Sequence, residues 1–93
     1  MIASFADAET ERLFHGIHSR RLPTDIQRRA HKKLLLLHAA TNLDDLRSPP
    51  SNRLEALRGK RQGQHSIRIN DQWRVCFRWD DGNAHDVTIN DYH

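Results

Sequence analysis

The clearest candidates for chemistry lie on the segment 72–79, where polar and apolar side chains alternate strictly. One face of this expected strand is apolar and carries Trp73, Val75, Phe77 and Trp79. The opposite face carries Arg74, Cys76 and Arg78. A period of two is typical of a β-strand with one packed face and one wet face. The two arginines contribute nothing to a core, so they are candidates for binding an anion.

Segments 64–70 and 85–93 repeat this division and complete an expected antiparallel meander. Directly opposite residues must share a face, so each connecting loop needs an odd number of residues. A three-residue first loop, 70–72, gives the pairs Ile69–Trp73, Ile67–Val75 and Arg68–Arg74. A second loop centred on Asn83 gives the pairs Phe77–Ile89, Arg78–Thr88 and Arg74–Tyr92.

This register would place Arg68, Arg74 and Tyr92 together on the unpacked face. Like charges directly opposite each other weaken a sheet, so the facing arginines suggest an anion between them. The alternative is an ordinary solvated face whose arginines extend away from each other, since surface charges cost little. The pattern by itself leaves both possibilities open.

Charge is distributed unevenly along the chain, whose net charge is +3. Segment 52–79 contributes +5, from seven basic and two acidic side chains, and leaves −2 for the remainder. Such a concentration predicts contact with phosphate groups. Six of these seven cations are arginines, which favours bidentate phosphate recognition over diffuse attraction.

Length and composition narrow the class of protein. Ninety-three residues suit one domain, and no apolar run is long enough to span a bilayer or to form a signal peptide. Because Cys76 is the only cysteine, no internal disulfide is possible, which fits a reducing cytoplasm. We interpret Cys76 as an inert strand residue and the pair His15 and His18 as surface histidines, since nothing nearby completes a metal site.

The N-terminal half predicts two helices. Segment 1–5 reads as a short strand, and Asp7 can cap a helix over 8–15. A longer helix follows over 24–40, with Thr24 as its N-cap and Gln27 reaching back in a capping box. Its buried stripe is expected to comprise Ile26, Ala30, Leu34 and Leu37, widened by Leu35 and Leu36.

The connection to the meander contains a helical turn at 43–46 after the helix stop at Asn42, then an extended Pro-containing stretch at 47–51. Segment 52–57 is an expected edge strand with Leu54 buried, and 58–63 is a glycine-bounded basic turn. The expected fold is therefore α+β, with two N-terminal helices packed on one face of a small, mainly antiparallel sheet. The basic face is expected to stay open.

Nearly the whole chain resembles the HigB (plasmid-maintenance killer) branch of the RelE-like toxins. The most specific matches are the run Ser66-Ile-Arg-Ile-Asn-Asp-Gln-Trp-Arg74 and the ending Asp91-Tyr-His93. The resemblance implies a toxin that enters the ribosomal A site of the small subunit and cleaves mRNA there. It also implies a HigA-like helix-turn-helix antitoxin, with operator DNA bound only through that antitoxin and no membrane partner.

The resemblance further implies which residues act. The family's active residues map onto Arg58, Arg74, Asp91, Tyr92 and His93, with Lys60 and Arg61 as further phosphate contacts. One position departs from well-known members, because Glu55 stands where some carry a histidine. The identity of the general base is therefore open.

RNA cleavage without a metal or other cofactor needs a base, an acid and stabilisation of the phosphate. Arg74, with Arg58 or Arg68, suits the phosphate, and Arg78 is a further candidate contact. His93 is the natural acid or base, because its ordinary pKa lies near neutrality. Tyr92 could stack on a base, while Asp91 could orient His93 or act as base, as could Glu55.

Strict alternation sends Asp91 and His93 to the packed face, so we expect strand pairing to end near 90–92. Two alternatives to the nuclease remain. One is a non-catalytic RNA- or ribosome-binding module that uses the same basic sheet. The other is a toxin-derived protein with weakened activity, a reading that rests on Glu55 alone.

Overall fold

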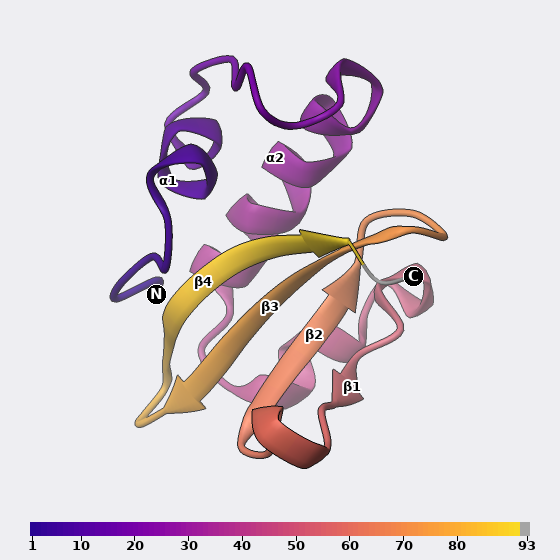
Figure 1. Ribbon diagram of the computed structural model, residues 1–93. Helices are drawn as coiled ribbons and strands as arrows, with labels where there is room; N and C mark the ends of the chain where they lie inside the picture. The colour runs from indigo at the N-terminus through magenta and orange to yellow at the C-terminus, as the bar shows by residue number, and fades with distance from the viewer. Residues whose placement is uncertain (92–93) are drawn as a thin grey trace.

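The computed structural model describes residues 1–91, which form a helical layer behind a four-stranded antiparallel sheet (Figure 1). The strand order follows the chain, β1-β2-β3-β4. The predicted α+β fold, with both helices preceding the sheet, is confirmed. The elements are α1 (Ala8–Phe14), α2 (Thr24–Ala39), three short 3-10 turns η1 (Leu43–Arg47), η2 (Pro50–Asn52) and η3 (Gly59–Arg61), and β1 (Glu55–Ala56), β2 (Gln64–Arg68), β3 (Trp73–Asp80) and β4 (Asn83–Asp91).

The core lies between α2 and the sheet. The predicted α2 stripe is buried, and it packs in one cluster with sheet residues that include Val75, Phe77 and Val87. Leu35 and Leu36 do not widen this stripe, because their exposed fractions are 47% and 40%. At 3.6 residues per turn, a helix on a flat sheet buries one stripe, and these two leucines fall outside it.

The first hairpin has the predicted register. Ile67 pairs with Val75 and Arg68 with Arg74, and the amide of Ile69 donates to the carbonyl of Trp73 at 2.9 Å. The Asn70 side chain organises the three-residue loop, since its Oδ1 accepts from the amides at positions 72 and 73. The parity argument therefore sufficed for this turn.

The second hairpin differs from the prediction. Its loop is the two-residue turn Asp81-Gly82, with positive φ at both residues (50° and 78°). Such turns match the twist of the flanking strands, and parity is restored by a β-bulge in which Asp86 and Val87 both lie opposite Phe77. The predicted pairs were therefore wrong, and the structure pairs Val75 with Ile89, Arg78 with His85, and Arg74 with Asn90.

The N-terminal segment runs parallel to β4. Isolated bridges join Ile2 to Ala84 and Phe5 to Val87, so the segment joins the sheet edge without forming a continuous strand. The bulge residue Asp86 donates its amide to Ser4 Oγ at 2.9 Å. The predicted strand over 1–5 is confirmed only as this pair of bridges.

The predicted N-terminal cap is confirmed for α1 and wrong for α2. Asp7 caps α1 as expected, and its carboxylate accepts from the Thr10 amide at 2.7 Å. The capping box of α2 was wrong, because Pro23 is the N-cap and Thr24 is already helical. Gln27 instead binds the preceding linker, donating to the Ser19 carbonyl at 2.7 Å and accepting from the Ser19 amide at 3.0 Å.

The connection between α2 and β2 is more helical than predicted. η1 begins after Asn42 as expected, but the end of the expected extended stretch forms η2. The edge strand shrinks to β1, and its buried neighbour is Leu57, at 7% exposure, whereas Leu54 is only half-buried. Within residues 1–91, no helix is both long and apolar enough to cross a bilayer.

Candidate functional site

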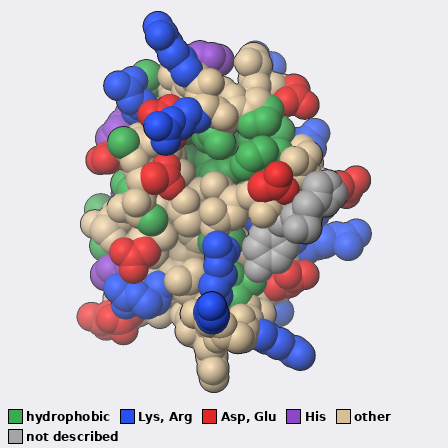
Figure 2. Space-filling view, in the orientation of Figure 1, with side chains coloured by type: hydrophobic (Ala, Val, Ile, Leu, Met, Phe, Trp, Pro, Cys, Tyr) green, Lys and Arg blue, Asp and Glu red, His purple; other side chains and the backbone are tan. Residues whose placement is uncertain are grey.

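The candidate site lies on the sheet face turned away from α2. In Figure 1 this face points toward the viewer, with β1 at its right edge, η3 at its lower end and α2 behind. Figure 2 shows Lys and Arg side chains over the middle and lower parts of the same face. The η3 turn lies at the lower end of this face, which the sequence predicted to stay open.

Several hydrogen bonds hold the Arg74 side chain in place on this face. Its Nε donates to Ser66 Oγ at 2.7 Å, and its Nη2 donates to the Arg53 carbonyl at 2.6 Å and the Ser66 carbonyl at 3.3 Å. The residue is only 7% exposed, which corrects the expectation of an open arginine on a wet surface. A buried guanidinium needs such partners, because an unpaired buried charge is strongly unfavourable.

Glu55 lies beside Arg74, with Oε2 3.8 Å from Arg74 Nη2. It reaches this place because Glu55 pairs directly with Ser66 across β1 and β2, which puts both on the Arg74 face. The Glu55 side chain stays 55% exposed, so a ligand can reach its carboxylate. The structure thus brings together the predicted phosphate-binding arginine and the carboxylate proposed as a base.

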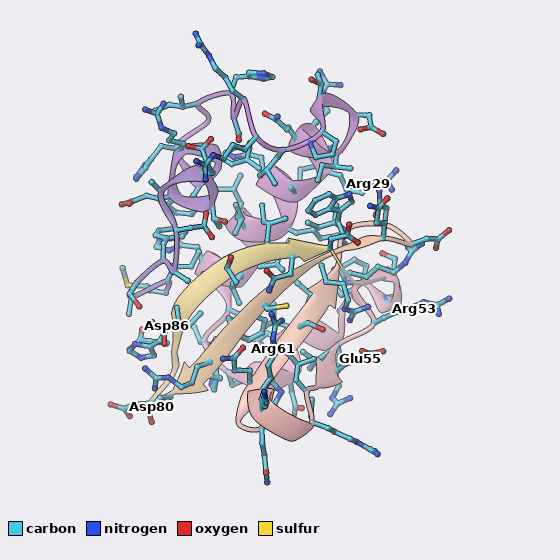
Figure 3. All side chains as sticks on the ribbon, in the orientation of Figure 1. Arg29, Arg53, Glu55, Arg61, Asp80 and Asp86 are labelled. Carbon is cyan, nitrogen blue, oxygen red and sulfur yellow. The ribbon has the colours of Figure 1, made fainter. Side chains whose placement is uncertain are left out.

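The basic turn contributes Arg61 to the same face. Figure 3 shows Arg61 lying over the middle of the sheet, and its Nη1 is 3.6 Å from the sulfur of the buried Cys76. Arg58 and Lys60 are exposed on the same turn, and Arg58 also lines a pocket of about 450 Å³ beside Gly59. The turn therefore carries three cations, and Arg61 is the one that lies over the sheet face.

Two other predicted phosphate contacts are paired elsewhere. Arg68 binds the exposed Asp71 in the first hairpin loop, and this guanidinium lowers the pKa of the Asp71 carboxyl through a hydrogen bond and its charge. Arg78 lies 3.5 Å from the Asp86 carboxylate near the second turn. Arg68 and Arg74 therefore have separate protein partners, which explain the facing pair without a shared anion.

Of the three C-terminal residues in the predicted site, the structure describes Asp91. Asp91 is exposed, pairs with Trp73 and accepts from Gln72 Nε2 at 2.9 Å. Opposite partners share a face, so Asp91 lies on the side away from Arg74, as alternation predicted. Tyr92 and His93 lie outside the described residues, so their predicted roles stay predictions.

Sequence reasoning missed the groups that hold Arg74 in place. Ser66 was assigned to the correct face, and the confirmed first-hairpin register places it two positions from the partner of Arg74. The parity of the strands could therefore have identified it as a partner. The Arg53 carbonyl could not have been found this way, because its position depends on a left-handed residue (φ 43°) that follows η2.

Comparison with known proteins gives consistent results. A sequence profile described as "RelE-like toxin of type II toxin-antitoxin system HigB" matches residues 3–93. "Toxin HigB-1" of Vibrio cholerae is 40% identical over 99% of this chain and 94% of its own length. "Endoribonuclease HigB" of Proteus vulgaris is 29% identical over the full length of both chains.

Solved structures support the fold alone, because their sequence identity is low. A mutant of YafQ from E. coli superposes with a TM-score of 0.62 at 12% identity, covering 98% of this chain and 93% of that one. YafQ from E. coli strain BL21(DE3) gives a TM-score of 0.56 at 11% identity and the same coverage. The helix-backed sheet of this chain is therefore one that YafQ shares, and the sequence matches place the chain in the HigB-like family, the RelE-like toxins of type II toxin-antitoxin systems.

Proposed function

We propose that this chain is a ribosome-dependent endoribonuclease that cleaves translated mRNA and so inhibits growth. The observation that carries the proposal is the anchored Arg74 guanidinium, with the Glu55 carboxylate 3.8 Å away on the sheet face opposite α2. The name of the Proteus vulgaris relative, an endoribonuclease, supports the same activity. Membership of a type II family implies an antitoxin partner.

The proposed reaction is an internal transesterification. The 2′-hydroxyl loses its proton to a base and attacks the adjacent phosphorus, the bond to the 5′-oxygen breaks, and that oxygen takes a proton from an acid. The products are a 2′,3′-cyclic phosphate and a 5′-hydroxyl. Charge that develops on the phosphate is where a preorganised guanidinium is most effective.

Each residue has a role in this proposal. Arg74 contacts the scissile phosphate, while Arg61, Arg58 and Lys60 hold the neighbouring backbone. Glu55 is the base, because its carboxylate lies 3.8 Å from Arg74 Nη2. The predicted roles of Tyr92 and His93, with His93 as the acid, complete the proposal. Asp91 pairs with Trp73 on the side away from Arg74, so its proposed role is to orient His93.

We further propose that the chain acts in the cytoplasm, in the A site of the small ribosomal subunit, on mRNA. Its antitoxin would be of the HigA-like helix-turn-helix type, and operator DNA would be bound only through that antitoxin. These partners follow from the family resemblance and from the basic segment 52–79.

The decisive experiment is to induce the chain alone and to map the 5′ ends of cellular messages. We expect growth arrest and new 5′ ends inside translated regions, both prevented by co-expression of the cognate antitoxin. Arg74→Ala and His93→Ala should each abolish the cuts while the purified proteins stay folded by circular dichroism.

Two outcomes would contradict the nuclease. Intact messages together with salt-sensitive binding to ribosomes would indicate a non-catalytic binding module. Intact messages without growth arrest would indicate a toxin-derived protein with weakened activity.

A further inference from the structure

A second basic site lies outside the face just described, in a groove between α2 and the end of β2. The groove has a volume of about 650 Å³. Its lining includes five cationic side chains and one carboxylate, that of Asp25. The cations are Arg28, Arg29, Lys32, Lys33 and Arg68.

The floor of this groove is held in place by specific contacts. Arg29 Nη1 donates to the Ile69 carbonyl at 3.4 Å, at the end of the sheet where Figure 3 shows Arg29. Lys33 Nζ donates to Asn52 Oδ1 at 2.5 Å, and Asn52 in turn donates to the Leu46 carbonyl at 3.1 Å. Two cations are therefore positioned by three separate segments of the chain.

Lys33 is an unusual residue to bury. It is 8% exposed, and its described partner is an amide oxygen, which carries no charge. Burial lowers the pKa of the Lys33 ammonium, and the charges of Arg29 and Arg68 lower the same pKa further. A lysine with a perturbed pKa that also lines a groove is a candidate for a ligand site.

Four of the five groove cations have no ion-pair partner among residues 1–91. No ion pair there involves Arg28, Arg29, Lys32 or Lys33, and Arg68 pairs with Asp71 outside the groove lining. On α2, Arg28 precedes Lys32 by four residues and Arg29 precedes Lys33 by four, a spacing at which like charges destabilise a helix. A bound anion would relieve this repulsion.

We infer that this groove binds backbone phosphates of an RNA strand, as a contact separate from the scissile-phosphate site. Arg68 connects the two places, because it lines the groove and is also the cross-strand partner of Arg74. A strand bound at the sheet face can therefore continue around the end of β2. The choice of RNA as the ligand rests on the proposed function.

The lining favours a nucleic-acid backbone over a protein segment. An amphipathic helix docked in a groove is held by apolar anchors along one of its faces. Among the lining residues the apolar side chains are Leu36, which is 40% exposed, and Ile69, which is buried in the core. Arginine and lysine with a single carboxylate instead match the requirements of a polyphosphate.

The test measures binding of a fluorescein-labelled 2′-O-methyl single-stranded RNA, which cannot be cleaved by 2′-hydroxyl attack, over a range of salt concentrations. The variant is Arg28→Gln/Lys32→Gln, both exposed in the groove. The matched control is Arg20→Gln/Arg21→Gln, which removes the same charge from exposed positions outside it. Thermal unfolding checks that both pairs remain folded.

For the groove variant we expect at least tenfold weaker binding. The slope of log K against log salt should fall by about 1.4, since each phosphate contact on a single strand contributes about 0.7. The control should change the slope by less than half as much. Equal effects of the two pairs, or no effect of the groove pair, would overturn the inference, as would loss of antitoxin binding with RNA binding unchanged.

The same design separates this inference from the proposed nuclease. A chain that binds RNA through the groove but leaves cellular messages intact refutes the nuclease and supports the groove. A chain that cuts messages while its RNA binding is unaffected by Arg28→Gln/Lys32→Gln overturns the groove and supports the nuclease.

Discussion

At the scale of single residues, the main feature of Arg74 is that hydrogen bonds fix the orientation of its charged guanidinium. The Ser66 hydroxyl and the Arg53 carbonyl fix two of its nitrogens, and Glu55 and Arg61 lie on the same face. A guanidinium held in this way cannot reorient toward water, so it is ready for charge that develops on a phosphate. Lysine has neither the planar fork nor the reach to make the same contacts.

Arg74→Lys should therefore abolish most cleavage while keeping the charge. We expect a loss of about 10²-fold or more in the single-turnover rate on programmed ribosomes, the usual cost of removing one preorganised donor. Arg12→Lys, on the exposed surface of α1, serves as the control and should stay within twofold of the wild-type rate. A lysine variant that retained full activity would show that charge alone suffices.

Ser66→Ala tests whether the anchor of Arg74 matters. The substitution leaves Arg74 Nε without its Ser66 Oγ acceptor, which should reduce the free energy of unfolding by about 1–3 kcal/mol. We also expect about tenfold slower cleavage with unchanged affinity for ribosomes, since a loss of about 1.4 kcal/mol in transition-state stabilisation slows a reaction about tenfold. Equal loss of binding and cleavage would instead indicate a general disturbance of the face.

His65 should make stability depend on pH. Its ring stacks on Phe77 with centroids 6.1 Å apart, and burial lowers the pKa of the imidazole. The unfolded chain has an ordinary histidine pKa of about 6.5. Between the lowered folded pKa of His65 and this value, it therefore binds more protons than the folded chain. Stability should be fully present above about pH 6.5 and decline as pH falls through the folded pKa of His65.

The measurement is the free energy of urea unfolding between about pH 5 and 7.5. His65→Gln removes the titrating group and should flatten this dependence, whereas His15→Gln, at an exposed position, should leave the slope as in the wild-type chain. If both substitutions gave the wild-type slope, His65 would not be the source of the pH dependence.

At the scale of elements, the β3–β4 hairpin shows how a tight turn and a bulge compensate each other. The Asp81-Gly82 turn sets one parity, and the extra residue at Asp86 and Val87 reverses it before the core pairs begin. Val87 and Ile89 thereby reach the packed face despite an even-numbered loop. The bulge also gives the N-terminal segment a place to bind, through Ser4 Oγ.

Asp86 should matter for its backbone conformation more than for its charge. Its φ is 53°, a region that aspartate and asparagine tolerate and β-branched residues avoid. We expect Asp86→Val to cost about 1–2 kcal/mol in urea unfolding, the usual penalty of this region. Asp86→Asn should stay within about 0.5 kcal/mol, since the Arg78 ion pair is exposed. Equal costs would instead assign the stabilisation to the ion pair.

At the scale of the whole molecule, a single layer of helices leaves two separate basic surfaces. The sheet face holds the Arg74 site, and the groove between α2 and β2 holds the second cluster of cations. Asn52 links them. It is fully buried, accepts from Lys33 in the groove, and precedes Arg53, whose carbonyl anchors Arg74.

Asn52→Ala should therefore affect both surfaces. It removes the acceptor for Lys33 and the donor to the carbonyls of Leu46 and Ser48, so we expect a loss of at least about 2 kcal/mol in the free energy of unfolding. Cleavage should also fall at temperatures where the variant remains folded. Asn52→Asp keeps an acceptor for Lys33 and should recover part of the stability. Normal cleavage by a destabilised Asn52→Ala variant would show that the two surfaces are independent.

The sequence by itself determined the features that depend on local spacing. Alternation along 72–79 assigned the two faces of β3, parity gave the first hairpin register, and Asp7 marked the start of α1. These features are set by neighbours within a few residues, so a linear pattern contains them. Family resemblance singled out Arg74 as an active residue and Glu55 as a departure from the family pattern, but it gave neither residue a place in space.

Only the tertiary structure decided how those positions meet. The bulge at Asp86, the pairing of Arg68 with Asp71 and the burial of Arg74 under contacts from Arg53 and Glu55 all depend on which segments pack together. A long side chain can reach any of several partners, and the packing of the chain selects one of them. The periodicity of a strand fixes the direction of a side chain, and the fold fixes the group that it binds.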